Sequence, residues 1–170
     1  MKLIVGDASS LILLAKANIL DDLLELTDII IPTIVQQEIM KGKEKNKQDA
    51  YYIEQLINQN KIQIEEPSEI NVSKIKFIYR LDAGELYAIT LAREKGIDLL
   101  IDDRDGIIVC HKLNIRIHTA LMILEELIIG KFISIDKAKF ALTLLIENGR
   151  YTSNDIKNIN ERVGLWKIRI

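Results

Sequence analysis

Short apolar runs that alternate with longer amphipathic segments restrict the fold of this chain more than any other feature. Mainly apolar runs lie at 2–5, 28–31, 61–64, 98–101 and 115–118. Strands this short and this apolar are typical of parallel sheets whose two faces are both covered by helices. The segments between them carry apolar residues at helical spacing. The chain is therefore expected to be α/β, a three-layer α/β/α sandwich around a central, mainly parallel sheet.

The predicted helices fill the gaps between these strands. Pro32 suits the start of one helix that runs through Met40, and Gly96 is expected to end another that begins near Asp82. Everything after Thr119 is expected to be helical. A length of 170 residues fits one domain, so we expect a single domain over 1–170 in which 131–170 form a helical C-terminal extension. The other expected helices cover 9–17, a segment from Asp21, 49–60, 68–80 and 103–114.

Composition excludes several classes of protein. The single cysteine, Cys110, cannot form an internal disulfide. No apolar run approaches the ~18 residues of a membrane span, and the opening apolar run is too short for a signal peptide, so a cytoplasmic protein is expected. The net charge of −2 gives no overall positive field for nucleic acid. A lysine-rich loop over 41–47 is either a solvated loop or a local phosphate contact.

Acidic residues follow two of the predicted strands. Asp7 comes directly after the first, and Asp102 and Asp103 come directly after the strand at 98–101. Ligands of open α/β sheets bind outside the carboxyl ends of the strands. These acids are therefore expected at the edge of the sheet where chemistry takes place.

Two glutamates occupy positions that the helical pattern turns inward. Glu85 is spaced three and four residues from Ala88 and Ile89, and Glu38 lies four residues after Ile34. A carboxylate on an apolar helix face is costly unless it is paired or bound to a cation. With no Arg or Lys at matching inward positions, the acids favour a site for a hard divalent ion such as Mg²⁺ or Mn²⁺.

Each acid also has a purely structural interpretation. Asp82 and Glu85 have the spacing of a capping box. Asp103 could be the N-cap of the helix that follows it, and Asp7 could form an ordinary turn into a helix. Glu38 could lie at an exposed helix rim. The order of the acids along the chain, rather than any one of them, carries the metal-site hypothesis.

Other catalytic patterns are weak or missing. Gly6 stands alone, without a phosphate-binding glycine loop. One cysteine and two histidines do not have the spacing of a zinc site, so Cys110 is interpreted as a buried structural residue. His118 ends a predicted strand and is expected to have a structural or rim role.

Three stretches of the sequence resemble the PIN-domain family of metal-dependent ribonucleases, in particular its prokaryotic toxin-type members. They are VGDASSLILLAKANILDDLLEL (5–26), IIIPTIVQQEIMKG (29–42) and LDAGELYAITLAREKGIDLLIDDRDG (81–106). The family places Asp-x-Ser after its first strand, a Glu in the helix after the second, a third acid in a later alanine-rich helix and a fourth after the next strand. The chain departs from the pattern in having Glu, rather than the commoner Asp, as the third acid.

The resemblance implies catalytic roles for Asp7, Glu38, Glu85 and Asp103, which would bind Mg²⁺ or Mn²⁺. Asp102 would supplement or replace Asp103, and Ser9 would hydrogen-bond Asp7 or a ligand water. It further implies cleavage of single-stranded RNA, a toxin role, a cognate antitoxin and a homodimer.

Two other functions are compatible with the sequence. The chain could be a non-catalytic PIN-like binding or scaffold protein, in which the acids are remnants. It could also be an aspartate-based phosphotransferase with Asp7 as nucleophile, although such enzymes usually carry a second Asp where this chain has Ser9.

Overall fold

The computed structural model describes residues 3–42 and 47–163, so Lys43 and Lys45 of the lysine-rich loop lie outside the described residues. Within these ranges a five-stranded sheet has the order β3-β2-β1-β4-β5, and every neighbouring pair is parallel. The predicted α/β class and parallel sheet are confirmed. The strands are β1 (Leu3–Gly6), β2 (Asp28–Ile31), β3 (Ile62–Ile64), β4 (Asp98–Leu100) and β5 (Ile117–His118).

The helices lie where the apolar spacing predicts them, with ends shifted by one or two residues. Gly96 ends its helix in the left-handed conformation, with φ of 64°, which glycine adopts without strain. The helices are α1 (Ala8–Lys16), α2 (Leu20–Leu24), α3 (Thr33–Met40), α4 (Gln48–Asn58), α5 (Glu69–Ile78), α6 (Ala83–Lys95), α7 (Arg104–Lys112), α8 (Ala120–Ile129), α9 (Ile135–Asn148) and α10 (Ser153–Val163).

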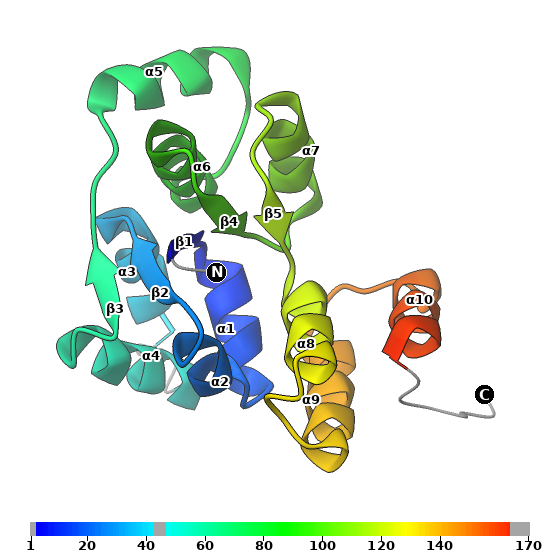
Figure 1. The fold of residues 1–170 in the computed structure, drawn as a ribbon. Helices are drawn as coiled ribbons and strands as arrows, with labels where there is room; N and C mark the ends of the chain where they lie inside the picture. The colour runs from blue at the N-terminus through cyan, green and yellow to red at the C-terminus, as the bar shows by residue number, and fades with distance from the viewer. Residues whose placement is uncertain (1–2, 43–46, 164–170) are drawn as a thin grey trace.

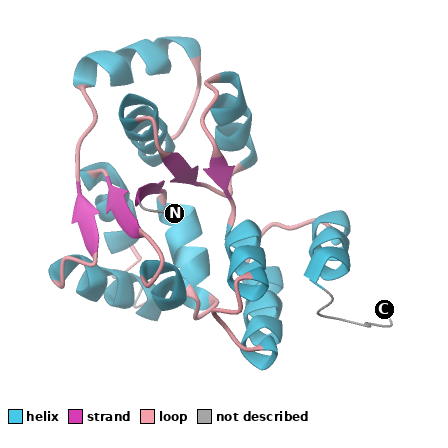
Figure 2. Cartoon of the chain, viewed as in Figure 1, coloured by secondary structure: helices cyan, strands magenta, loops and turns pink. Residues whose placement is uncertain are grey.

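Helices cover both faces of the sheet, as Figures 1 and 2 show. Helices α6 and α7 lie on one side of β4 and β5, while α1 and α8 lie on the other (Figure 1). The central strands are consequently buried on both faces: Ile4, Val5, Leu99 and Leu100 are all fully buried. Burial on both sides explains why these strands read as continuous apolar runs rather than as alternating patterns.

The strand order reverses between β1 and β4, which forms a topological switch point. From β1 the chain first builds outward through β2 and β3, then crosses back to add β4 and β5 on the other side. Gly6 is paired with Leu100, and the backbone N–H of Asp7 donates to the carbonyl of Leu100 at 3.1 Å. The residues that follow β1 and β4 are thereby held side by side, at the crevice where such sheets bind ligands.

The C-terminal helices do not share one environment. Helix α9 packs against α8 and α1 and buries Ala138, Ala141 and Leu142 in the main core. Helix α10 packs mainly on α8 and stands to one side of the molecule in Figure 1. Among the described residues, none of the helices combines the length and apolar character needed to cross a membrane.

Candidate functional site

Asp7 lies at the switch point, between the end of β1 and the start of α1. Its carboxylate caps α1 by accepting a hydrogen bond from the Ser10 backbone at 2.8 Å, and the Ser9 hydroxyl donates to both of its oxygens at 3.0 Å. The side chain is only 3% exposed. Burial raises the pKa of Asp7 to about 6, against the lowering effect of the Ser10 and Ser9 hydrogen bonds. The predicted turn from Asp7 into a helix and the predicted Ser9 contact are both confirmed, and Asp7 is in addition the N-cap of α1.

Glu85, in the first turn of α6, is half-buried and faces other acids. Burial raises the pKa of Glu85 to about 7, and the nearby negative charges of Asp103, Asp7 and Asp82 raise it further. A hydrogen bond from the Asp82 backbone acts in the opposite direction. The side chain of Asp82 makes no cap hydrogen bond, so that half of the capping-box interpretation is wrong.

Glu38, on α3, caps the N-terminus of α6 in place of the Asp82 side chain. Its Oε1 accepts a hydrogen bond from the Gly84 backbone at 3.0 Å, which brings the carboxylate to the N-terminus of α6. A Cβ atom at position 84 would lie 2.1 Å from Glu38 Oε2, so only glycine permits this approach. The inward orientation predicted for Glu38 is therefore produced by a contact with a neighbouring helix, rather than by burial in the core.

Asp102 and Asp103 point to different neighbours. Asp103 caps α7 by accepting hydrogen bonds from the backbones of Asp105 at 2.9 Å and Gly106 at 3.3 Å, as its N-cap interpretation predicts. Its charge acts on Glu85. Asp102 instead accepts from the Ala120 backbone at 3.0 Å and from the Tyr151 hydroxyl at 2.8 Å. Both oxygens of Asp102 are thus used within the protein, and burial raises its pKa.

The structure brings the five predicted acids to one region of the sheet, which we call the acidic edge. Its members are Asp7, Glu38, Glu85, Asp102 and Asp103. Glu85 responds to the charges of Asp7 and Asp103, Asp7 responds to Asp102, and Glu38 contacts Gly84 beside Glu85. None of the five forms an ion pair with a described residue. Helix N-termini, which favour negative charge, meet here from α1, α6 and α7.

The acidic edge fits a hard divalent ion in the chemistry of its donors. Every side chain is a carboxylate, and oxygen is the ligand that Mg²⁺ and Mn²⁺ prefer. In the described part of the chain, however, no three acidic, histidine or cysteine side chains lie close enough together to form a preformed metal site.

Three residues at this edge were not identified from the sequence. Ser10 is fully buried and helps to lower the pKa values of both Asp7 and Asp102, although its Oγ makes no hydrogen bond of normal geometry to a described residue. Gly84 admits Glu38, and Tyr151 reaches Asp102 from the C-terminal extension. The glycine in Asp-Ala-Gly-Glu at a helix start was a usable signal, because glycine there favours close approach. Nothing local marks Tyr151.

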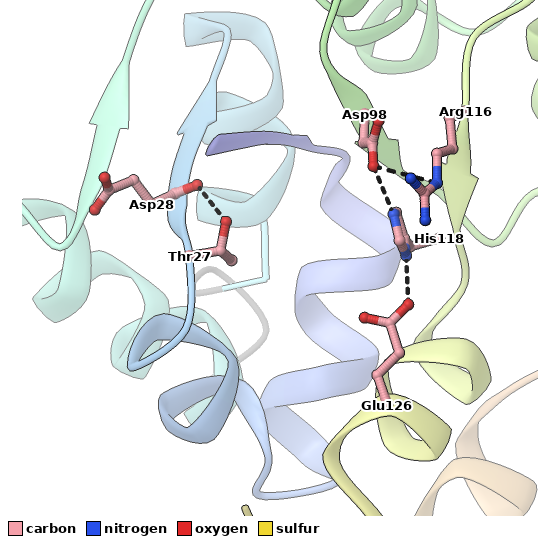
Figure 3. Close-up of polar contacts among 6 residues, drawn as sticks. All are labelled: Thr27, Asp28, Asp98, Arg116, His118 and Glu126. Atoms are coloured by element: carbon pink, nitrogen blue, oxygen red, sulfur yellow. Dashed lines mark hydrogen bonds and ion pairs between the residues drawn. The ribbon is translucent and has the colours of Figure 1, made fainter. Parts of the chain in front are cut away.

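A second group of acids surrounds His118, and we call it the histidine cluster. His118 Nε2 lies 2.8 Å from Asp98 Oδ2 and its Nδ1 lies 2.9 Å from Glu126 Oε1, so one ring bridges β4, β5 and α8 (Figure 3). Arg116 Nε lies 3.6 Å from the same Asp98 oxygen. The structural role predicted for His118 is confirmed. Cys110 is also fully buried, and burial raises its pKa to about 12, which leaves an inert thiol.

The sequence was also compared with models of known protein families. A family model described as a PIN domain matches residues 3–163, nearly the whole chain and most of its C-terminal extension. No curated protein matches the chain closely enough to count as a relative.

Proposed function

The chain belongs to the PIN-domain family, and on this premise we propose that it is a divalent-metal-dependent ribonuclease that cleaves single-stranded RNA. PIN domains are generally nucleases. The observation that carries the proposal is the acidic edge itself. Its carboxylates gather at the switch point, two of them have strongly raised pKa values, and no described cation offsets their charge. A divalent cation bound at this edge would offset the charges of these carboxylates.

Asp7, Glu38, Glu85 and Asp103 are the residues that would hold Mg²⁺ or Mn²⁺. Asp103 is favoured over Asp102, because the Asp102 oxygens already accept hydrogen bonds from Ala120 and Tyr151. When bound, the ion supplies activation of water near neutral pH and neutralises charge on the phosphodiester. PIN domains typically use divalent metals.

The surrounding residues orient the carboxylates. The Ser9 hydroxyl and the Ser10 backbone fix the rotamer of Asp7, and the Gly84 backbone fixes Glu38. Groups that hold metal ligands in place commonly change metal affinity by 10- to 100-fold when they are removed.

Cleavage of single-stranded RNA tests the proposal. Purified protein is incubated with labelled RNA and Mn²⁺ or Mg²⁺, beside EDTA and beside Asp7→Asn as a control for contaminating nucleases. We expect metal-dependent cleavage that the substitution abolishes. Absence of both cleavage and calorimetric metal binding would sink the nuclease proposal and leave a non-catalytic binding protein.

We further propose that the protein is the toxin of a toxin–antitoxin pair, acts in the cytoplasm and forms a homodimer. Exposed apolar side chains along the α8–α9 pair support a dimer: Ile129, Phe132, Ile135 and Phe140 are each more than half exposed. Such side chains gather at protein interfaces. Light scattering on the wild type and Phe140→Ser tests the dimer. Growth arrest on expression, relieved by the product of an adjacent gene, tests the toxin role.

A further inference from the structure

A cleft of about 770 Å³ opens beside the acidic edge, and nothing in the proposed chemistry uses it. Asp102 and Asp103 form part of its lining. The other walls come from the start of α7, from α8 and from the segment that ends in α10. We call it the C-terminal cleft. Its position means that a strand bound at the acidic edge can continue into it.

Three arginines line the C-terminal cleft, and they come from different parts of the chain. Arg104 begins α7, Arg150 precedes α10, and Arg162 lies near the end of α10. Arg104 and Arg150 are exposed and form no ion pair with a described residue. Arg162 Nε pairs with Glu125 Oε1 at 2.9 Å, which holds its guanidinium against α8.

Four acids also line the cleft, and backbone or hydroxyl groups donate hydrogen bonds to three of them, Asp102, Asp103 and Asp155. Asp155 accepts hydrogen bonds at 2.7 Å from both the backbone and the hydroxyl of Thr152, and Asp102 accepts from Ala120 and Tyr151. Both bonds to Asp155 fall on its Oδ2, and the charge of Arg104 lowers the pKa of Asp155 from across the cleft. Among the described residues, Arg104 and Arg150 nevertheless form no ion pair, so both guanidinium groups can meet a phosphate.

Apolar side chains supply part of the remaining lining and suit the faces of bases. Leu121, Met122 and Ile107 are among them, beside the polar Thr119 and Asn158. Arginine binds phosphate with a planar fork of donors, and it also stacks on bases. A groove that combines guanidinium groups with apolar surface is the usual means of binding single-stranded nucleic acid without reading its sequence.

We propose that the C-terminal cleft binds the RNA strand next to the scissile bond, with Arg104, Arg150 and Arg162 contacting its phosphates. This inference rests on the proposed ribonuclease function and adds a substrate-binding role for the C-terminal extension. Tyr151 joins the two regions, because its hydroxyl donates to Asp102 at 2.8 Å while its neighbour Arg150 lines the cleft.

The test measures RNA binding separately from cleavage. A fluorescein-labelled single-stranded oligoribonucleotide is titrated with full-length protein in EDTA, and anisotropy is recorded at several salt concentrations. The variants are Arg104→Ala, Arg150→Ala and Arg162→Ala. Lys157→Ala is the matched control, since Lys157 is a 70% exposed cation on α10 that pairs with Glu161 and does not line the cleft. Circular dichroism verifies that Arg162→Ala, which loses the Glu125 pair, remains folded.

We expect each cleft variant to weaken binding by ~3- to 10-fold and to lower the slope of log affinity against log salt by about 0.7, the value for one lost single-strand phosphate contact. Lys157→Ala should leave both nearly unchanged. If the cleft variants bind like Lys157→Ala while the wild type still cleaves RNA with Mn²⁺, the cleft proposal is overturned and the nuclease proposal stands.

Two further outcomes separate the proposals. RNA binding that depends on the arginines, without metal-dependent cleavage, would support the proposed RNA-binding role of the cleft and overturn the proposed ribonuclease activity. Arginine-dependent binding of labelled polyglutamate, with no binding of RNA, overturns the RNA assignment in favour of an acidic polypeptide partner.

Discussion

The acidic edge and the histidine cluster are two groups of carboxylates in one sheet, and they are neutralised differently. In the histidine cluster, Asp98 and Glu126 lie on either side of the His118 ring at hydrogen-bond distance, and Arg116 adds a cation beside Asp98. Each ring nitrogen of His118 thus faces one carboxylate. At the acidic edge the carboxylates find only backbone N–H groups, serine and tyrosine hydroxyls and one another.

The difference distinguishes structural acids from candidate ligands. A positively charged side chain nearby offsets the charge of a carboxylate in the folded chain. Burial without such a neighbour raises the pKa of the carboxylate. Asp7 and Glu85 show that shift. Strongly perturbed acids that share a crevice are candidates for function, because functional sites are where burial and like charges shift pKa values most. Position at a sheet edge alone would not have separated the two groups.

Exchanging single carboxylates for amides should have the largest effect. Asp7→Asn and Glu85→Gln should lower RNA cleavage by ~100-fold or more, because bound metal supplies several kcal/mol of transition-state stabilisation. Glu126→Gln, in the histidine cluster, should retain cleavage near the wild-type rate. Initial rates with saturating Mn²⁺ measure the contrast. Equal losses in all three variants would abolish the distinction between the two groups.

Metal binding at the acidic edge should stabilise the folded protein, and the histidine cluster should not contribute to this effect. Mg²⁺ or Mn²⁺ at 100 times its Kd should raise the free energy of unfolding by about 2.7 kcal/mol. Thermal unfolding with and without metal should show the gain in the wild type and in Glu126→Gln, but not in Asp7→Asn. A shift that persists in Asp7→Asn would place the ion elsewhere.

Removing the His118 ring should destabilise the histidine cluster. His118→Ala should cost about 2 kcal/mol, since it leaves Asp98 and Glu126 without their shared partner and opens space at a position that is 2% exposed. Arg116→Ala is the control and should cost less than about 0.5 kcal/mol, because the Arg116 side chain is 76% exposed. Urea unfolding measures both. Metal affinity should not change in either variant, and a change would couple the two groups.

The pH dependence of stability should show the smallest effect and opposite signs at two acids. Because burial raises the pKa of Asp7 from 3.8 to about 6, its contribution is fully present below pH ~4 and is lost as the pH rises through 6. In metal-free protein, Asp7→Asn should therefore gain about 1–2 kcal/mol over the wild type between pH 4 and pH 7.

Asp155 provides the opposite case. Hydrogen bonds from Thr152 lower its pKa, so its contribution is present above its ordinary pKa and is lost as the pH falls. Asp155→Asn should approach wild-type stability only in acid. Urea unfolding from about pH 2 to about pH 7 measures both variants, because the Asp155 contribution is lost only below its ordinary pKa. Parallel profiles would contradict the assignment of causes.

Much of the candidate site was accessible from local pattern. Asp7, Asp102 and Asp103 stand directly after apolar runs, and Glu38 and Glu85 stand on helix faces whose spacing can be counted. The same local logic gave the cap interpretations, and the structure has Asp7 and Asp103 as N-caps at the acidic edge. Capping and ligation were therefore not true alternatives, since a cap uses one carboxylate oxygen and aims the side chain at a helix N-terminus.

Interactions between residues close in sequence determine the strands, the helices and the placement of acids at strand ends. Apolar periodicity, caps and the Gly96 stop act within a few residues, so they determine the strands, the helices and the acids at strand ends without reference to the rest of the molecule. The neighbours of each strand, and hence the switch point between β1 and β4, depend on packing between distant segments. The contact of Glu38 with Gly84 spans 46 residues and that of Tyr151 with Asp102 spans 49. Only the folded sheet brings such pairs together, because no local preference encodes which helix a side chain will meet.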